Sequence, residues 1–398
     1  MRLSPLARVP LGDLVTIRSG GTPSKGNAEY WGGHLPWITA KDLKSRYLVS
    51  SIQKLSAAGR TVATIAPVDA LLILVRGMGL FKGIPIGICR TEVAFNQDVK
   101  ALIPGSAVDS GFLCCALESL KPVLMQLVEA AGHGTGRLDT AKLLALPIPL
   151  PPLPEQRRIA AILGTWDAGI EKAERILSAK TNRREHWRTA LVVQFESSTK
   201  PLHELITPTQ RPVPRPSKPY TAIGIRSHGK GTFHRHVSRP EQIDMDTLFV
   251  VTATDLIVNI TFAWEGAIAL AKPEDQGCLV SHRFPTFEIN EAVVNRDYLG
   301  FAVNNARFFY ALRGISPGSA GRNRVLNQKE FLRLSVPFPP KKQQDRIAEL
   351  LTAADKDISA TVDLIARLKI QKSGLMQKLL TGKIRVPEAV ADLSPAAD

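Results

Sequence analysis

The chain carries an internal repeat at an offset of 188 residues, and this repeat constrains its fold more than any other feature. Residues 146–152 read Leu-Pro-Ile-Pro-Leu-Pro-Pro, and residues 334–340 read Leu-Ser-Val-Pro-Phe-Pro-Pro. Residues 155–160 align with residues 343–348 at the same offset, and the match continues without a gap for about 50 residues. Two copies of one framework predict an architecture related by a pseudo-twofold axis.

A long helix is expected after each proline run, because proline cannot continue a hydrogen-bonded ladder and biases the preceding residue toward extended structure. Apolar residues then recur at spacings that alternate between four and three, the seam of a coiled coil. Each predicted helix of about 39 residues would measure ~58 Å. The seam positions are Ile159, Leu163, Trp166, Ile170, Leu177, Trp187 and Leu191 in the first copy, and Ile347, Leu351, Ile358, Ile365, Leu368, Leu375 and Leu379 in the second.

The fold class predicted from this pattern is α+β, with two mixed α/β domains separated by the two long helices. We expect the helices to pack on each other as an antiparallel coiled coil; a large domain separates them in the sequence, which favours this direction indirectly. Both copies place a cation, Arg184 or Lys372, at the same seam position, where a polar residue can set the register. The predicted parts are globular domains at 1–154 and 194–340, helices at 155–193 and 341–385, and a flexible tail at 386–398.

The net charge predicts a polyanionic partner. The chain of 398 residues has 51 Lys and Arg against 36 Asp and Glu, a formal charge of +15, and nucleic acid is the usual partner of so basic a protein. No apolar run reaches the ~18 residues of a membrane span. Four cysteines do not make a disulfide framework, so a cytoplasmic protein is expected. No Cys and His spacing predicts a metal site.

Several segments resemble one known family. The frame Leu11-Gly-Asp-Leu, Gly20-Gly-Thr-Pro-Ser24 and Trp37-Ile-Thr is similar to the start of a target-recognition domain in the specificity subunits of type I restriction–modification systems. Ile148-Pro-Leu-Pro-Pro-Leu-Pro-Glu-Gln-Arg-Arg-Ile-Ala160 resembles the family signature between that domain and its spacer helix. The ending Leu375-Met-Gln-Lys-Leu-Leu-Thr-Gly-Lys383 resembles the C-terminal helix, so the likeness extends over nearly the whole chain.

The resemblance implies a subunit without catalytic residues, in which each recognition domain reads one half of a bipartite site in double-stranded DNA. The helices would set the spacer and dock two modification (methyltransferase) subunits, and restriction subunits would join to translocate and cut DNA. S-adenosylmethionine, ATP and Mg are then expected on the partner subunits, with no cofactor bound directly by this chain. The glycine-rich and Asn/Asp-Pro-Pro-aromatic motifs of an amino-methyltransferase are absent from the sequence, as is a phosphate-binding Gly-x4-Gly-Lys-Ser/Thr loop. The alternative is a coiled-coil scaffold that does not read DNA.

Candidate DNA contacts follow from the charge map. Residues 200–239 contain eight Lys or Arg and a single acid, Glu204. Basic side chains contact phosphates, whereas Arg, Asn and Gln in a groove specify bases. Each candidate could equally belong to a solvated loop or a turn without a ligand. The candidates are Lys25, Lys41, Lys44, Arg46, Asn96 and Gln97 in the first domain, and Arg226, Ser227, His228, Lys230, Arg235, Arg322 and Arg324 in the second.

Overall fold

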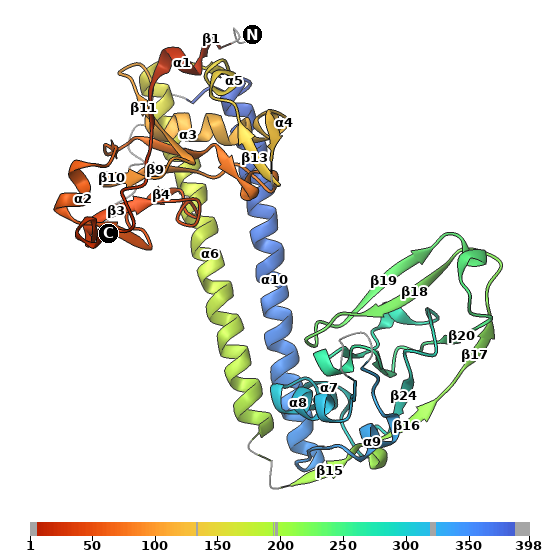
Figure 1. Cartoon of the computed structure of the whole chain (residues 1–398). Coiled ribbons are helices and arrows are strands. Elements are labelled where there is room, and N and C mark those ends of the chain that lie inside the picture. The colour runs from red at the N-terminus through yellow and green to blue at the C-terminus, as the bar shows by residue number, and fades with distance from the viewer. Residues whose placement is uncertain (1–5, 133, 194, 196–197, 319–323, 387–398) are drawn as a thin grey trace. The chain divides into compact units, whose positions relative to one another are not determined.

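The computed structural model describes residues 6–132, 134–193, 195, 198–318 and 324–386. The chain divides into two compact units: unit 1 comprises Met1–Glu174 and Asp363–Asp398, and unit 2 comprises Arg175–Val362. Each unit contains one globular head and part of two long helices, α6 (Leu153–Val193) and α10 (Lys341–Leu380) (Figure 1). We call the globular parts head 1 (6–152) and head 2 (198–340). In the described ranges, no helix is long and apolar enough to cross a membrane.

The helices α6 and α10 pack antiparallel within each unit. They contain 41 and 40 residues, which corresponds to ~60 Å each. Between the two ion pairs named below for each unit, the residue number rises along α6 and falls along α10, so the antiparallel coiled coil expected from the sequence is confirmed. These ion pairs are Lys372–Asp167 and Lys369–Glu174 in unit 1, and Lys180–Asp357 and Arg184–Asp355 in unit 2.

Head 1 is built on a five-stranded sheet in the order β2-β11-β7-β9-β4. All four residues of β7 are buried, which places this strand in the centre of the core. The helix α3 (Ser110–Ser119) packs against this core with its central residues fully buried. The strands of the sheet are β2 (Val15–Ser19), β11 (Val99–Pro104), β7 (Leu71–Leu74), β9 (Ile86–Cys89) and β4 (Tyr47–Leu48).

Smaller sheets and short helices complete head 1. A four-stranded sheet has the order β5-β3-β10-β6, and a three-stranded sheet has the order β12-β13-β8. The strands are β3 (Trp31–Ile38), β5 (Gln53–Leu55), β6 (Ile65–Ala66), β8 (Arg76–Gly77), β10 (Val93–Phe95), β12 (Val128–Ala131) and β13 (Thr135–Leu138). The short helices are α1 (Leu11–Leu14), α2 (Ala57–Thr61), α4 (Lys121–Gln126) and α5 (Thr140–Leu144).

Head 2 contains a four-stranded sheet in the order β16-β24-β21-β22 and a five-stranded sheet in the order β17-β20-β23-β18-β19. The first sheet comprises β16 (Ile206–Thr209), β24 (Thr286–Ile289), β21 (Leu256–Val258) and β22 (Ile268–Leu270). The second comprises β17 (Pro212–Pro214), β20 (Thr247–Val250), β23 (Leu279–Val280), β18 (Tyr220–Ile225) and β19 (Thr232–Val237). The helices are α7 (Arg296–Val303), α8 (Ala306–Gly314) and α9 (Gln328–Arg333).

The two heads share a framework that the sequence repeat predicts. In head 1, β2 pairs antiparallel with β11, the strand that precedes α3; in head 2, β16 pairs antiparallel with β24, the strand that precedes α7. Each proline run pairs with the start of its own head. These pairs are β1 (Arg8–Pro10) with β14 (Pro147–Pro149), and β15 (Thr199–Pro201) with β25 (Ser335–Pro337). The internal repeat is therefore structural, and the proline runs close each head before its helix begins.

Candidate nucleic-acid interface

A basic segment of head 2 includes the hairpin formed by β18 and β19. From residue 205 to residue 240 the sequence contains seven Lys or Arg and no Asp or Glu. The strand β19 lies at the edge of its sheet, and its four central residues, Phe233–His236, are all exposed. Among the predicted contacts, Arg226, Lys230 and Arg235 are exposed on this hairpin. Three of the seven cations therefore lie on a regular two-stranded ribbon and its turn, whereas Arg211 and Arg215 lie outside it and pair with Asp255 and Asp246.

The turn of this hairpin is held by the 3-10 helix η5 (Ala263–Glu265). The Ser227 hydroxyl donates to the Glu265 carboxylate at 2.7 Å, and the His228 N–H donates to the Glu265 carbonyl at 2.8 Å. His228 adopts a left-handed conformation with φ of 61°. The Asn304 amide also donates to the Gly229 carbonyl at 3.0 Å. Ser227 and His228 thus fix the shape of the turn, and these contacts are internal to head 2.

Arg324, another predicted contact of head 2, meets the same helix η5. The Arg324 guanidinium lies over the Trp264 ring, 5.1 Å from its centroid, and Arg313 Nε donates to the Trp264 carbonyl at 3.2 Å. Arg324 and the turn of the β18–β19 hairpin therefore both contact η5. Arg322 lies outside the described residues.

In head 1, two tryptophans anchor the glycine-rich segment that contains Lys25. Trp37 Nε1 donates to the Gly21 carbonyl, Trp31 Nε1 donates to the Ser24 carbonyl, and the two rings meet edge to face at 5.1 Å. Lys25 Nζ lies 5.9 Å from the centroid of the Trp37 ring. The Gln97 amide oxygen accepts a hydrogen bond from the Thr22 hydroxyl in the same segment. Lys25 and Gln97 are therefore brought together, and both are exposed.

The other four candidates of head 1 separate into two pairs. Lys41 and Lys44 are exposed in the turn after β3. Asn96 is only 8% exposed, and its amide donates to Asp98 at 3.0 Å. The Arg46 side chain is 11% exposed and points into the protein. We therefore correct the expectation for Asn96 and Arg46 and assign both side chains to the packing of unit 1, because the Asn96 amide nitrogen and both terminal nitrogens of Arg46 have partners within it.

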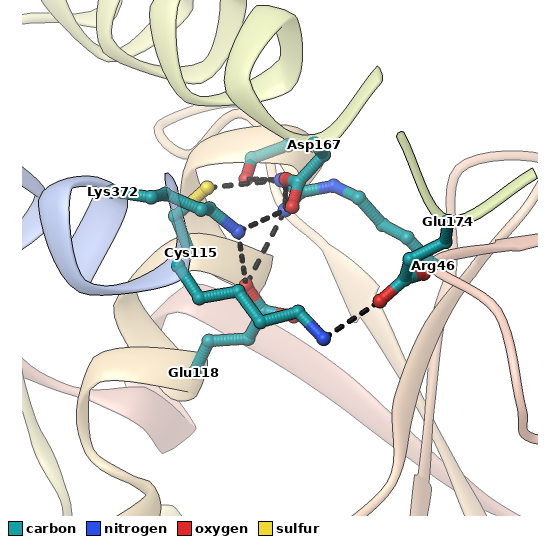
Figure 2. Close-up of polar contacts among 8 residues, drawn as sticks. Arg46, Cys115, Glu118, Asp167, Glu174 and Lys372 are labelled. Atoms are coloured by element: carbon teal, nitrogen blue, oxygen red, sulfur yellow. Dashed lines mark hydrogen bonds and ion pairs between the residues drawn. The ribbon is translucent and has the colours of Figure 1, made fainter. Parts of the chain in front are cut away.

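Arg46 belongs to a partly buried ionic cluster that joins head 1 to both long helices (Figure 2). Its guanidinium contacts Asp167 on α6 at 2.7 Å and Glu118 on α3 at 3.3 Å. Lys372 on α10 contacts the same two carboxylates. Two cations thus balance two carboxylates, which is the condition for burying charge at low cost.

The pKa values in this cluster reflect its burial. Burial alone lowers the pKa of Arg46, but the neighbouring Cys115, Cys114 and Glu118 outweigh it and raise the pKa overall. Burial also raises the pKa of the Cys115 thiol, although Arg46 opposes this effect. The thiol stays protonated and accepts a hydrogen bond from Arg46 Nη2 at 2.9 Å. The cluster therefore anchors the head, and its cysteine is not poised as a nucleophile.

The second seam cation forms the repeat-related pair in unit 2. Arg184 Nε and Nη2 donate to the two oxygens of Asp355 at 2.8 and 3.0 Å. Burial alone lowers the pKa of Arg184, but its bonds to Asp355 and Glu185 outweigh this and raise the pKa. Residues 167 and 355 are 188 positions apart, as are residues 184 and 372. The ion pairs Lys372–Asp167 and Arg184–Asp355 therefore occupy equivalent positions in the two repeats. Applying the offset of 188 residues to the aspartates as well as to the seam cations would have predicted both pairs.

The fourteen predicted seam residues are all buried or partly buried. The buried ones are Ile159, Leu163, Ile170, Ile347, Leu351, Ile365 and Leu379, and the partly buried ones are Trp166, Leu177, Trp187, Leu191, Ile358, Leu368 and Leu375.

A buried glutamine anchors each long helix to its head. Gln156 accepts a hydrogen bond from the Asp109 N–H at 2.9 Å and donates to the Ala107 and Pro151 carbonyls. Its repeat partner Gln344 accepts from the Asn295 N–H at 2.9 Å and donates to the Pro339 carbonyl. Asp109 and Asn295 are the N-caps of α3 and α7. The motif after the prolines therefore joins each long helix to the first turn of a head helix.

The described residues contain no group of three or more His, Cys, Asp or Glu that could hold a metal ion. The four cysteines are free and buried. Burial raises the pKa of Cys89 to about 12, with a smaller contribution from Asp69. This thiol is therefore protonated near neutral pH.

A family model for the type I restriction modification DNA specificity domain matches residues 5–179 and 220–369. The specificity subunit of the EcoR124I/EcoR124II type I restriction enzyme of Escherichia coli is 29% identical over 189 residues, which cover 46% of this chain and 46% of that protein. The MjaIX specificity subunit of Methanocaldococcus jannaschii is 30% identical over 172 residues, covering 41% of this chain and 38% of that protein. The matched segments thus span less than half the length of these relatives.

Solved structures support the fold. The S subunit of a type I restriction–modification system from M. genitalium superposes with a TM-score of 0.60 at 13% identity, covering 96% of this chain and 98% of that one. A chain from a structural study of complex assembly and conformational transition in the type I R-M system superposes with a TM-score of 0.53 at 14% identity, covering 96% of this chain and 100% of that one.

Proposed function

The chain belongs to the family of type I restriction–modification DNA specificity proteins, and from this premise we propose that it selects the DNA sequence on which a type I enzyme acts. Each head would read one half of a bipartite site in double-stranded DNA. The chain would act in the cytoplasm and contribute recognition rather than catalysis.

One observation carries this proposal: the two heads share a repeated framework but carry different exposed polar surfaces. The repeat includes the closing strand pairs, the anchoring glutamines and the cross-helix ion pairs. Head 1 exposes the tryptophan-anchored segment with Lys25, whereas head 2 exposes the basic hairpin with Arg226 and Arg235. A shared framework with two different exposed surfaces suits a protein that reads two different DNA half-sites.

We propose that two modification subunits dock on the helix pair and that restriction subunits join this complex. S-adenosylmethionine, ATP and Mg would then bind to those partners. An apolar groove on the helix pair supports a docking role, because an exposed apolar patch marks an interaction site. A groove of about 620 Å³ in unit 2 is lined by residues of both helices and by Phe195. The exposed apolar residues are Ile176, Leu350, Val362, Leu364 and Ile370.

Mapping of methylated adenines across the genome, with and without this gene, tests the proposal. A bipartite methylated motif should vanish on deletion and return when the gene is restored. Unchanged methylation, with the partner genes intact, would contradict DNA selection. A gel shift of the complex with the modification subunits, at two salt concentrations, separates the scaffold alternative. A scaffold would show the same weak, salt-sensitive binding to the motif and to a scrambled duplex.

The helices are proposed to set the spacer between the half-sites. Inserting four residues, about one helical turn, after Glu174 in α6 and after Val362 in α10 lengthens both helices at repeat-related positions. The repeat-related ion pairs Lys372–Asp167 and Arg184–Asp355 stay intact, because each lies within one unit. The methylated motif should keep both half-sites and gain spacer length. A motif with an unchanged spacer would show that the helices do not determine the distance.

A further inference from the structure

We propose that the outer face of the β18–β19 ribbon, formed by Arg226, Phe233 and Arg235, reads base pairs in the DNA major groove. This inference rests on the proposed DNA selection and assigns the reading of one half-site to named residues. Phe233 was not among the contacts predicted from sequence.

The pairing register separates the two faces of the ribbon. Residues directly opposite each other share a face, so Phe233 lies over Gly224, and Arg235 lies over Ala222. The other face carries Ile223 opposite His234 and is turned toward the core: Ile223 is buried, and His234 contacts the buried carboxylate of Asp275 at 2.7 Å. The outer face therefore exposes Phe233 and Arg235, with Arg226 at the turn, while Val237 further along the same face is buried.

The outer face is organised before any ligand binds. A Cβ atom on Gly224 would lie 2.3 Å from the Phe233 ring, so the ring covers this glycine closely. The Arg226 guanidinium lies 5.1 Å from the centroid of the same ring, and its Nη1 donates to the Thr232 carbonyl at 2.7 Å. Phe233 nevertheless remains 38% exposed. Side chains held in this way on regular strands suit precise recognition.

Protection of a sheet edge is the simpler explanation for exposed charges on β19. Natural proteins place charged side chains on edge strands to prevent pairing with other chains. That explanation accounts for Arg235 but not for Phe233, since an exposed aromatic ring makes an edge more adhesive. The ring and the two guanidiniums together resemble a contact surface.

The chemistry of this face fits the major groove of duplex DNA. The groove is about 12 Å wide and admits a two-stranded ribbon. Successive strand residues rise ~3.4 Å, close to the separation of base pairs, so Phe233 and Arg235 would face positions two base pairs apart. Arginine recognises guanine through O6 and N7, and an apolar ring recognises the thymine methyl group. The exposed cations of the hairpin, Arg226, Lys230 and Arg235, supply the attraction to the phosphates.

Two variants of the full chain, each assembled with the modification subunits, test this inference on a random duplex library sequenced for methylation. Arg226→Lys keeps the charge but loses the bidentate geometry. It should relax one base position of one half-site by about 10- to 100-fold. Phe233→Leu should alter a neighbouring position about 5- to 10-fold by the same logic. The other half-site should keep its sequence. Arg333→Lys, an exposed arginine on α9 paired with Glu330, is the matched control and should change nothing.

Three results would overturn the inference. An unchanged motif in both variants would remove this face from DNA reading while leaving the proposed function intact. Equal loss on every sequence, with a weaker salt dependence, would assign Arg226 to phosphate contact only. A wild-type complex without any preferred sequence would overturn the proposed function itself. Thermal melting of each variant checks that the ribbon is folded; Arg226→Lys leaves Phe233 over Gly224 and serves as the readout if Phe233→Leu is unstable.

Discussion

The pairs Lys372–Asp167 in unit 1 and Arg184–Asp355 in unit 2 are copies of one feature, yet their surroundings differ. In unit 1 the aspartate is 28% exposed and also binds Arg46 from the head. In unit 2 the aspartate is 44% exposed, and the cation's second carboxylate, Glu185, lies on the same helix. Head 1 therefore reaches this point of the helix pair through an ion pair from Arg46, whereas head 2 reaches Arg184 through the Phe301 ring, whose centroid lies 5.6 Å from the guanidinium. The cross-helix ion pair is common to both repeats, whereas the additional contact from the head differs between the two units.

The largest effect is expected from breaking the tie that is specific to unit 1. Arg46→Met should destabilise unit 1 by about 3 kcal/mol, because it leaves two partly buried carboxylates, Glu118 and Asp167, sharing the single positive charge of Lys372. Hydrogen exchange of α3 and head 1 peptides in increasing urea measures this change. Arg60→Met is the matched control: Arg60 and Glu92 are about half exposed, and a surface pair contributes at most about 1 kcal/mol. If both variants lower the free energy of unfolding equally, the Arg46 cluster stabilises unit 1 no more than a surface ion pair does.

The next effect concerns the anchoring glutamines, where the two units are more alike. Gln156→Leu leaves one N–H and two carbonyls without their partner, and should cost about 2 kcal/mol. Gln344→Leu leaves one N–H and one carbonyl, so about 1 to 2 kcal/mol is expected. Hydrogen exchange at the first turns of α3 and α7 reports on each. Gln343→Leu, at an exposed neighbouring position, should have little effect. A larger loss from Gln343→Leu than from Gln344→Leu would contradict the anchoring role.

The sequence predicts the frame well because the frame is local and repeated. Heptad spacing identifies both helices, and the offset of 188 residues links the proline runs, glutamines and seam cations. Arg46 could not be placed in this way. Its partners Glu118 and Asp167 lie 72 and 121 residues away, and no local periodicity reports such contacts. The charge of Arg46 made it a candidate DNA contact, but the tertiary structure turns its side chain inward.

Phe233 shows the opposite limitation. A phenylalanine in a strand is normally interpreted as core, and its exposure depends on which face the ribbon presents to solvent. The pairing register of β18 with β19 and the place of β19 at the sheet edge decide this. Both are properties of the folded sheet. Charge counting therefore located the basic segment but could not distinguish the outer face from the face held by Asp275.

The smallest expected difference lies between the coupling energies of the two repeat-related ion pairs. Two factors oppose each other: Arg184 binds Asp355 through both oxygens, which favours unit 2, while deeper burial favours unit 1. We expect burial to dominate, because solvent screens exposed pairs, giving about 1 kcal/mol in unit 1 against about 0.5 kcal/mol in unit 2. Double-mutant cycles with Lys372→Met and Asp167→Asn, and with Arg184→Met and Asp355→Asn, measure both energies. A stronger coupling in unit 2 would show that bidentate geometry outweighs burial in this helix pair.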